Sequence, residues 1–171
     1  MWINGKILPL LNFQTASNMK KDHLNTTDFD LWHTIREETE TAAAAEPMLA
    51  SFLHQTVLRH DSLDSVLAYH LSSKLGSPIM DVRALFEIYQ QALGSDARIS
   101  NCVEADLKAI YERDPACDEY SLPLLYFKGF HAIQAHRINH WLYQNGRKTL
   151  AYFLQNRMSE VFGVDIHPAA R

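Results

Sequence analysis

Apolar residues recur at helical spacing along the chain from about residue 28 to residue 162. Residues three and four apart lie on one face of an α-helix, so this spacing predicts helices that each bury one side. Glycine, proline and capping residues interrupt the pattern where helices usually begin or end. The predicted helices run from Thr27 or Asp28 to Ala45, from Pro47 to Leu58, from Asp61 or Ser62 to Gly76, from Ser77-Pro78 to Gly94, from Ser95 or Asp96 to Asp114, from Ser121 and Pro123 to Gly146, and from about Leu150 to Gly163.

This pattern predicts an all-α domain of about seven helices over residues 28–163. Strands and helices do not alternate, and neither G-x-G-x-x-G nor G-x-x-x-x-G-K-[ST] occurs, so the nucleotide-binding folds with those loops are not expected. Residues 1–27 lack sustained periodicity and end in a polar stretch rich in asparagine and threonine. We expect them to form a flexible extension.

The last residues break the helical pattern. Gly163 is a helix stop, Val164-Asp165-Ile166 alternates like the start of a strand, and Pro168 excludes a continuing helix. We therefore expect a short β-like segment over residues 164–171. Because these residues have no strand of their own to pair with, we expect them to be disordered or to pair only by accident.

Composition excludes some classes of partner. Of the 171 residues, 47% are hydrophobic and 21% are charged, and the net charge of -4 gives no reason to expect nucleic acid binding. No apolar run approaches the roughly 20 residues that span a bilayer, so no membrane partner is expected. Cys102 and Cys117 lack the spacing of a metal or disulfide framework. A cytoplasmic protein with reduced thiols is expected.

Two histidines and one aspartate are candidates for chemistry. His136 and His140 share one helix face, but Arg137 stands where a helical zinc motif has glutamate, and we expect a polar face and no metal site. Asp114 follows a helix C-terminus, where the helix dipole disfavours negative charge. It is either a turn residue or a carboxylate that binds an ammonium-bearing substrate.

Five separate stretches resemble the serine O-acetyltransferase family of cysteine biosynthesis, in order and with family-like spacing from about Asp28 to Arg171. They are Glu46-Pro-Met-Leu-Ala-Ser-Phe, Lys74-Leu-Gly-Ser-Pro-Ile-Met, Arg113-Asp-Pro-Ala, Leu124-Leu-Tyr-Phe-Lys-Gly-Phe-His-Ala-Ile-Gln-Ala-His-Arg and Val164-Asp-Ile-His-Pro-Ala-Ala. The resemblance implies an N-terminal helical domain and a C-terminal left-handed β-helix of hexapeptide turns, of which residues 164–171 are the first turn.

The resemblance also implies an activity, the transfer of an acetyl group from acetyl-CoA to the hydroxyl of L-serine. Asp165 matches the aspartate that orients the general-base histidine, and Asp114 matches the aspartate that contacts serine and the inhibitor cysteine. The histidine itself belongs to coils downstream of Arg171, and His167 does not replace it. We therefore expect the chain to be a truncated form that is inactive alone and binds no cofactor, acetyl-CoA being the family's co-substrate.

Partners follow from the same resemblance. It implies self-association, with trimers pairing into hexamers through the helical domain, and a partnership with O-acetylserine sulfhydrylase through a C-terminal tail absent from this chain. A second hypothesis is a helical oligomerisation module without catalysis, which leaves the Val-Asp-Ile-His-Pro ending unexplained. A third is a helical metal protein that uses His136 and His140, although the family commonly has tyrosine at the position of His136.

Overall fold

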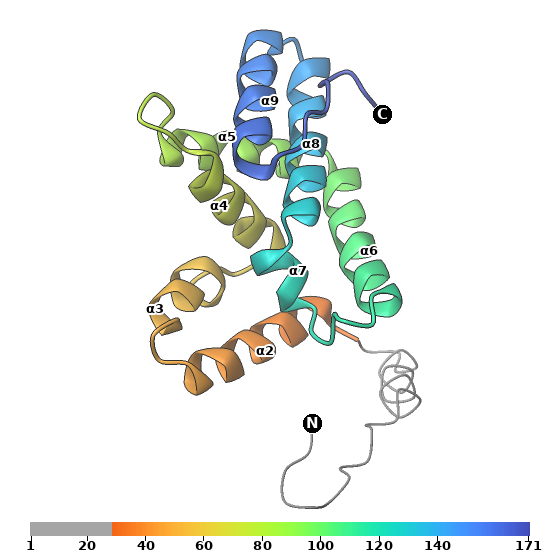
Figure 1. Cartoon of the computed structure of the whole chain (residues 1–171). Coiled ribbons are helices and arrows are strands. Elements are labelled where there is room, and N and C mark those ends of the chain that lie inside the picture. The colour runs from red at the N-terminus through yellow and green to blue at the C-terminus, as the bar shows by residue number, and fades with distance from the viewer. Residues whose placement is uncertain (1–28) are drawn as a thin grey trace, which may run out of the picture. The chain divides into compact units, whose positions relative to one another are not determined.

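Helices joined by short turns make up the part of the chain that the structure describes (Figure 1). The computed structural model describes residues 29–171, and Leu31–Arg171 form one unit. Within the described residues there is no strand apart from an isolated bridge between Ser77 and Met80, so the all-α prediction is confirmed. The elements are α2 (Leu31–Ala45), α3 (Ala50–Leu53), the π-helical turn η2 (His54–Leu58), α4 (Leu63–Leu75), α5 (Val82–Ser95), α6 (Ala97–Arg113), α7 (Ser121–Tyr126), α8 (Lys128–Gln144) and α9 (Lys148–Phe162).

Helix α8 is the central element of the unit, because it packs against α9, α5 and α6 (Figure 1). The helical spacing seen in the sequence places one apolar face of each helix in the shared core. No described helix is both long enough and apolar enough to cross a membrane. The largest fully buried side chains include Tyr89, Leu67, Leu71, Leu107, Ile138 and Leu154.

Several helix ends lie where the sequence predicted them. The hydroxyl of Ser62 accepts a hydrogen bond from the Ser65 N–H at 3.2 Å, and the Asp96 carboxylate accepts one from the Arg98 N–H at 3.0 Å. These bonds satisfy N–H groups that have no partner inside the first helical turn. Gly163 ends α9 with a φ of +74°, in the left-handed region that glycine adopts without strain.

Two predicted helix starts are wrong. Pro47 lies in a turn, and α3 begins only at Ala50. Ser77 and Met80 exchange two backbone hydrogen bonds of 3.0 and 3.1 Å, and this turn delays α5 until Asp81 caps it. In both places proline begins a turn instead of a helix, because local backbone pairing competes with helix formation. The predicted cap at Thr27 or Asp28 and the extension 1–27 lie outside the described residues.

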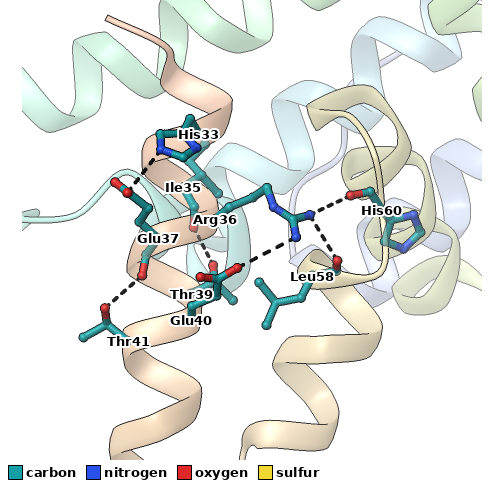
Figure 2. Close-up of polar contacts among 9 residues, drawn as sticks. All are labelled: His33, Ile35, Arg36, Glu37, Thr39, Glu40, Thr41, Leu58 and His60. Atoms are coloured by element: carbon teal, nitrogen blue, oxygen red, sulfur yellow. Dashed lines mark hydrogen bonds and ion pairs between the residues drawn. The ribbon is translucent and has the colours of Figure 1, made fainter.

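Arg36 of α2 closes the end of the π-helical turn η2 (Figure 2). One guanidinium nitrogen donates to the carbonyl oxygens of Leu58 and His60, at 3.0 and 2.9 Å. A second nitrogen lies 3.8 Å from the carboxylate of Glu40, one turn further along α2. Carbonyls at a helix C-terminus lack hydrogen-bond donors within the helix. The guanidinium of Arg36 supplies those donors here.

The longest predicted helix is broken in the structure. Residues 121–146 were expected to form one helix, but α7 ends at Tyr126 and α8 begins at Lys128. Phe127 between them is extended, with φ -85° and ψ 107°. The apolar spacing continues through the break, so periodicity alone could not reveal it. Side chains from other helices create the break by bonding to both ends of α7.

Glu38 of α2 caps the N-terminus of α7 from 82 and 83 residues away. Its two carboxylate oxygens accept hydrogen bonds from the N–H groups of Tyr120, at 3.1 Å, and Ser121, at 2.7 Å. No nearby side chain caps this helix. Burial raises the pKa of Glu38, and the two N–H donors oppose that increase by favouring the charged form.

Two buried histidines bind the other end of α7. The Nε2–H of His131 donates to the Leu124 carbonyl at 2.8 Å, and the Nε2–H of His70 donates to the Leu125 carbonyl at 3.1 Å. Carbonyls only accept, so each imidazole must carry its proton on Nε2. The rings contact each other edge to face, with centroids 5.1 Å apart. Burial lowers the pKa of His70 to about 3 and that of His131 to about 4.

The carboxylate cap can be tested by substitution. Glu38→Ala should lower the free energy of unfolding by about 1–3 kcal/mol, because it leaves buried N–H groups at the start of α7 without an acceptor. Glu37→Ala is the matched control, since Glu37 is the exposed neighbour on α2 and its carboxylate pairs with His33 in an exposed contact. It should change stability by less than about 0.5 kcal/mol. Urea unfolding measures both, and equal effects would contradict the assignment.

The buried histidines predict acid sensitivity. Their pKa values are lower in the folded chain than the ordinary value near 6.5, so the unfolded chain binds more protons. The stability that the two neutral rings contribute is fully present above about pH 6.5. It is lost as the pH falls toward about 4 for His131 and about 3 for His70. The loss between pH 7.5 and pH 5 should be about 2 kcal/mol per histidine. Urea midpoints across that range measure it.

Two variants separate these histidines from the rest of the chain. His131→Asn keeps a side-chain donor but removes the titrating ring, so the dependence of stability on pH should become shallower. His54→Asn changes an exposed histidine and should leave that dependence intact. The assignment is wrong if both variants keep the full pH dependence.

Candidate functional site

Asp114 lies where α6 ends, in a turn that its own side chain stabilises. Its Oδ1 accepts a hydrogen bond from the Ala116 N–H at 2.9 Å, and its backbone carbonyl accepts one from the Cys117 N–H at 3.1 Å. Cys117 is fully buried, so the turn is fixed to the core at its far end. The turn-residue interpretation of Asp114 is therefore correct at the level of local structure. It does not decide whether the carboxylate also binds a ligand.

A groove of about 570 Å³ opens beside Asp114. One wall comes from the last turns of α6, and the other comes from the junction of α7 and α8, where Phe127 and Phe130 lie. Asp106 lies further along the groove, and its carboxylate is bound by Arg137 at 2.5 Å and by Gln134 at 2.8 Å. The groove thus combines apolar walls with the side chains of Asp114 and Arg113, and this pair of opposite charges suits a small ligand that carries charged groups of both signs.

Asp165 lies two residues after the glycine that ends α9. Its side chain is exposed, and its Oδ1 accepts a hydrogen bond from the Gln155 side-chain amide at 2.7 Å. No contact joins the two candidate aspartates within the described residues, and Asp165 is not among the residues that line the groove beside Asp114.

Residues 164–171 are ordered against α8 and α9, so the expectation of disorder or accidental pairing is wrong. The structure also assigns no strand to them, because no neighbouring strand is present among the described residues. Side chains of the two helices supply the missing partners. We call these side chains the clasp, and they are His136, His140, Tyr143, Tyr152 and Gln155.

The histidine pair considered for metal binding belongs to this clasp. His136 Nε2 lies 3.3 Å from the carbonyl oxygen of Ala170, and His140 Nδ1 lies 2.7 Å from that of Pro168. Burial lowers the pKa of His136, which favours a neutral ring. In the described part of the chain, no group of three or more His, Cys, Asp or Glu side chains is placed to hold a metal ion. Both rings thus have a structural partner in the C-terminal segment.

A larger cleft of about 1020 Å³ lies beside the clasp. It is bounded by the start of α6, the second half of α8 and the last residues of the chain, with Arg98, Cys102 and Trp141 among its lining. Arg98 and Asp96 form an ion pair at its edge, with a 2.7 Å contact. Sequence analysis did not predict this cleft or the clasp, because neither leaves a recognisable spacing in the sequence.

Comparison with known proteins identifies the family. The family model described as "Serine acetyltransferase, N-terminal" matches residues 31–135. The serine acetyltransferase of Escherichia coli K12 is 52% identical over 141 residues, which cover 82% of this chain and 52% of that protein. The chain belongs to the serine acetyltransferase family. It spans about half the length of the curated relatives that it matches.

Solved structures agree with this assignment. The serine acetyltransferase of Neisseria gonorrhoeae in complex with serine matches with a TM-score of 0.84 and 92% identity, over 87% of this chain and 61% of that one. A serine acetyltransferase in complex with CoA matches with a TM-score of 0.81 and 50% identity, over 83% of this chain and 60% of that one. The fold of the helical unit is therefore the fold of this family's N-terminal part.

Proposed function

We propose that this chain is the helical, serine-contacting part of a serine O-acetyltransferase that converts acetyl-CoA and L-serine to O-acetyl-L-serine and CoA. The observation that carries the proposal is the family membership together with Asp114 at the end of an open groove. A relative at 92% identity was solved with serine and another relative with CoA, which supports both substrates.

The proposed role of Asp114 is to bind the ammonium group of serine, and that of the inhibitor cysteine, from the helical domain. A carboxylate is the natural partner of an ammonium ion, and the turn holds Asp114 in one orientation through the Ala116 N–H. Asp165 is not among the residues that line this groove. We propose that the complete site combines residues from neighbouring subunits.

The proposed role of Asp165 is to orient a general-base histidine supplied by a later part of the protein. That histidine would take the proton of the serine hydroxyl while the oxygen attacks the acetyl carbonyl, and CoA would leave with a proton. A carboxylate beside the imidazole fixes its tautomer and stabilises the cation that forms. In this proposal Asp165 positions the base and does not itself take the proton of serine.

The first test measures CoA release. The 171-residue chain, given acetyl-CoA and serine, should release no more CoA than a boiled sample. A hybrid in which the catalytic part of the N. gonorrhoeae relative follows these 171 residues, here named the extended protein, should be active. Release of CoA by the chain alone would contradict the assignment of the general base to a later segment.

The same assay tests Asp114. In the extended protein, Asp114→Asn should raise KM for serine about 10–100-fold, since a hydrogen bond to a charged group contributes about 1.5–3 kcal/mol. KM for acetyl-CoA should stay the same. Asp118→Asn, an exposed aspartate of the same loop, is the matched control and should change neither constant. An unchanged KM for serine in Asp114→Asn would remove the proposed role.

We also propose that the helical unit self-associates, and that in the whole protein this pairs trimers into hexamers. Four exposed apolar side chains lie on and beside α3, and we call them the α3 patch. They are Met48, 91% exposed, with Leu49, Phe52 and Tyr126. The rings of Phe52 and Tyr126 lie with centroids 6.5 Å apart, so residues distant in sequence join in one surface. Such patches favour association.

Light scattering tests this association. At tens of micromolar the chain should have a mass above the 19.6 kDa of a monomer. Met48→Glu should shift the population toward monomer, because it places a charge in the α3 patch. Gln91→Glu adds the same charge at an exposed position of α5 and should have no effect. A monodisperse monomer in the unaltered chain would overturn the proposal.

We also propose that the whole protein acts in the cytoplasm and binds O-acetylserine sulfhydrylase. It rests on family membership and not on a surface of the described residues. The alternative of a helical oligomerisation module without catalysis draws support from the α3 patch. An inactive extended protein that still associates would favour that alternative.

A further inference from the structure

We propose that Gln155 is a positioning residue for Asp165, and that the clasp on α8 and α9 sets the place of this carboxylate. The expected effect on catalysis rests on the proposed function. The contact between Gln155 and Asp165 can be tested without any activity. Asp165 lies on a segment without regular secondary structure, where an exposed side chain would otherwise sample several rotamers. Its orientation must therefore come from contacts with the helices.

The amide of Gln155 fixes one oxygen of the carboxylate. Gln155 is half-buried on α9, and its Nε2 donates to Asp165 Oδ1 at 2.7 Å. Among the described residues, Asp165 Oδ2 has no hydrogen-bond partner, so it remains to accept from another donor. An aspartate that orients an imidazole needs this arrangement, with one oxygen held by the protein and the other facing the ring.

Two histidines fix the backbone beyond Asp165. The ring nitrogens of His140 and His136 bond to the carbonyl oxygens of Pro168 and Ala170, as described above. The Pro168 side chain is buried even though it lies near the end of the chain. The segment is thus attached to α8 at two points three and five residues after Asp165.

The ring of His167 lies against two tyrosines and provides a third attachment. Its centroid is 6.0 Å from that of Tyr143 on α8 and 5.7 Å from that of Tyr152 on α9, and both contacts are edge to face. Its Nδ1 accepts a hydrogen bond from the Ala169 N–H at 3.1 Å. This assigns a positioning role to a histidine that the sequence analysis had excluded as the general base.

These contacts have one consequence for catalysis. The helices, through Gln155 and the three histidine contacts, determine where Asp165 points. Displacement of a catalytic group by about 1 Å can reduce a rate about 100-fold. Loss of the Gln155 amide should therefore reduce the rate of the chemical step and leave the binding of acetyl-CoA unchanged.

The structural part is tested on the 171-residue chain by NMR. The side-chain amide protons of Gln155 should move toward free-amide positions in Asp165→Ala, because their acceptor is lost. The backbone amides of Ala169 and Ala170, which donate to His167, should be protected from exchange and should lose protection in His140→Ala. His54→Ala, at an exposed position, is the matched control. Unchanged Gln155 amide signals in Asp165→Ala would overturn the proposal.

The catalytic part is tested on the extended protein. Gln155→Leu should lower kcat about 10–100-fold and leave KM for acetyl-CoA unchanged. Gln155→Glu should have an equally low kcat, because a carboxylate cannot donate a hydrogen bond to Asp165 and carries the same charge. Asn156→Ala is the matched control: this neighbouring amide bonds only to Glu160 of its own helix, and its loss should leave kcat within about twofold. A kcat of Gln155→Leu equal to that of the control would contradict the positioning role.

The two tests fail in different ways. If the extended protein is inactive before any substitution, the proposed function fails, and the NMR result still decides whether Gln155 holds Asp165. If the extended protein is active and Gln155→Leu keeps full activity, the proposed function stands and the positioning role is wrong.

Discussion

The attachment of α7 at both ends is the constraint on which the rest of this structure depends. Glu38 binds the two N–H groups at its start, and His70 and His131 bind the carbonyls of Leu124 and Leu125 near its end. A six-residue helix has little stability of its own, so these bonds define where it begins and ends. They join α2, α4 and α8 through one short element and turn the chain sharply at Phe127.

The break at Phe127 also forms the groove beside Asp114. Phe127 and Phe130 line one side of it, and they lie at the end of α7 and the start of α8. A continuous helix from Ser121 would carry these rings in another direction. The carboxylate of Glu38 and the imidazoles of His70 and His131, which hold α7 in place, therefore help to shape the groove beside Asp114. Such buried polar groups are costly unless fully bonded, and here most of their bonds go to backbone groups of α7.

The second candidate residue depends on the opposite end of α8. There α8 and α9 lie side by side (Figure 1), and their side chains hold the segment that carries Asp165. The same central helix therefore contributes to the surroundings of both aspartates, the groove of Asp114 through its first turn and the path of Asp165 through its later turns. In the proposed function the two carboxylates act in one assembled site, so both ends of α8 would contribute to it.

The sequence by itself determined the all-α class, the caps at Ser62 and Asp96, the stop at Gly163 and, through five motifs, the family. These features are local, because a cap or a glycine acts within one turn of backbone and apolar spacing reports which face is buried. Only the tertiary structure decided the break at Phe127, the conformation in which residues 164–171 are held and the contact between Gln155 and Asp165. Each of these depends on side chains that meet after the helices pack, such as Glu38 with Ser121, 83 residues apart. The sequence could name both aspartates, but the contacts that orient them exist only in the folded chain.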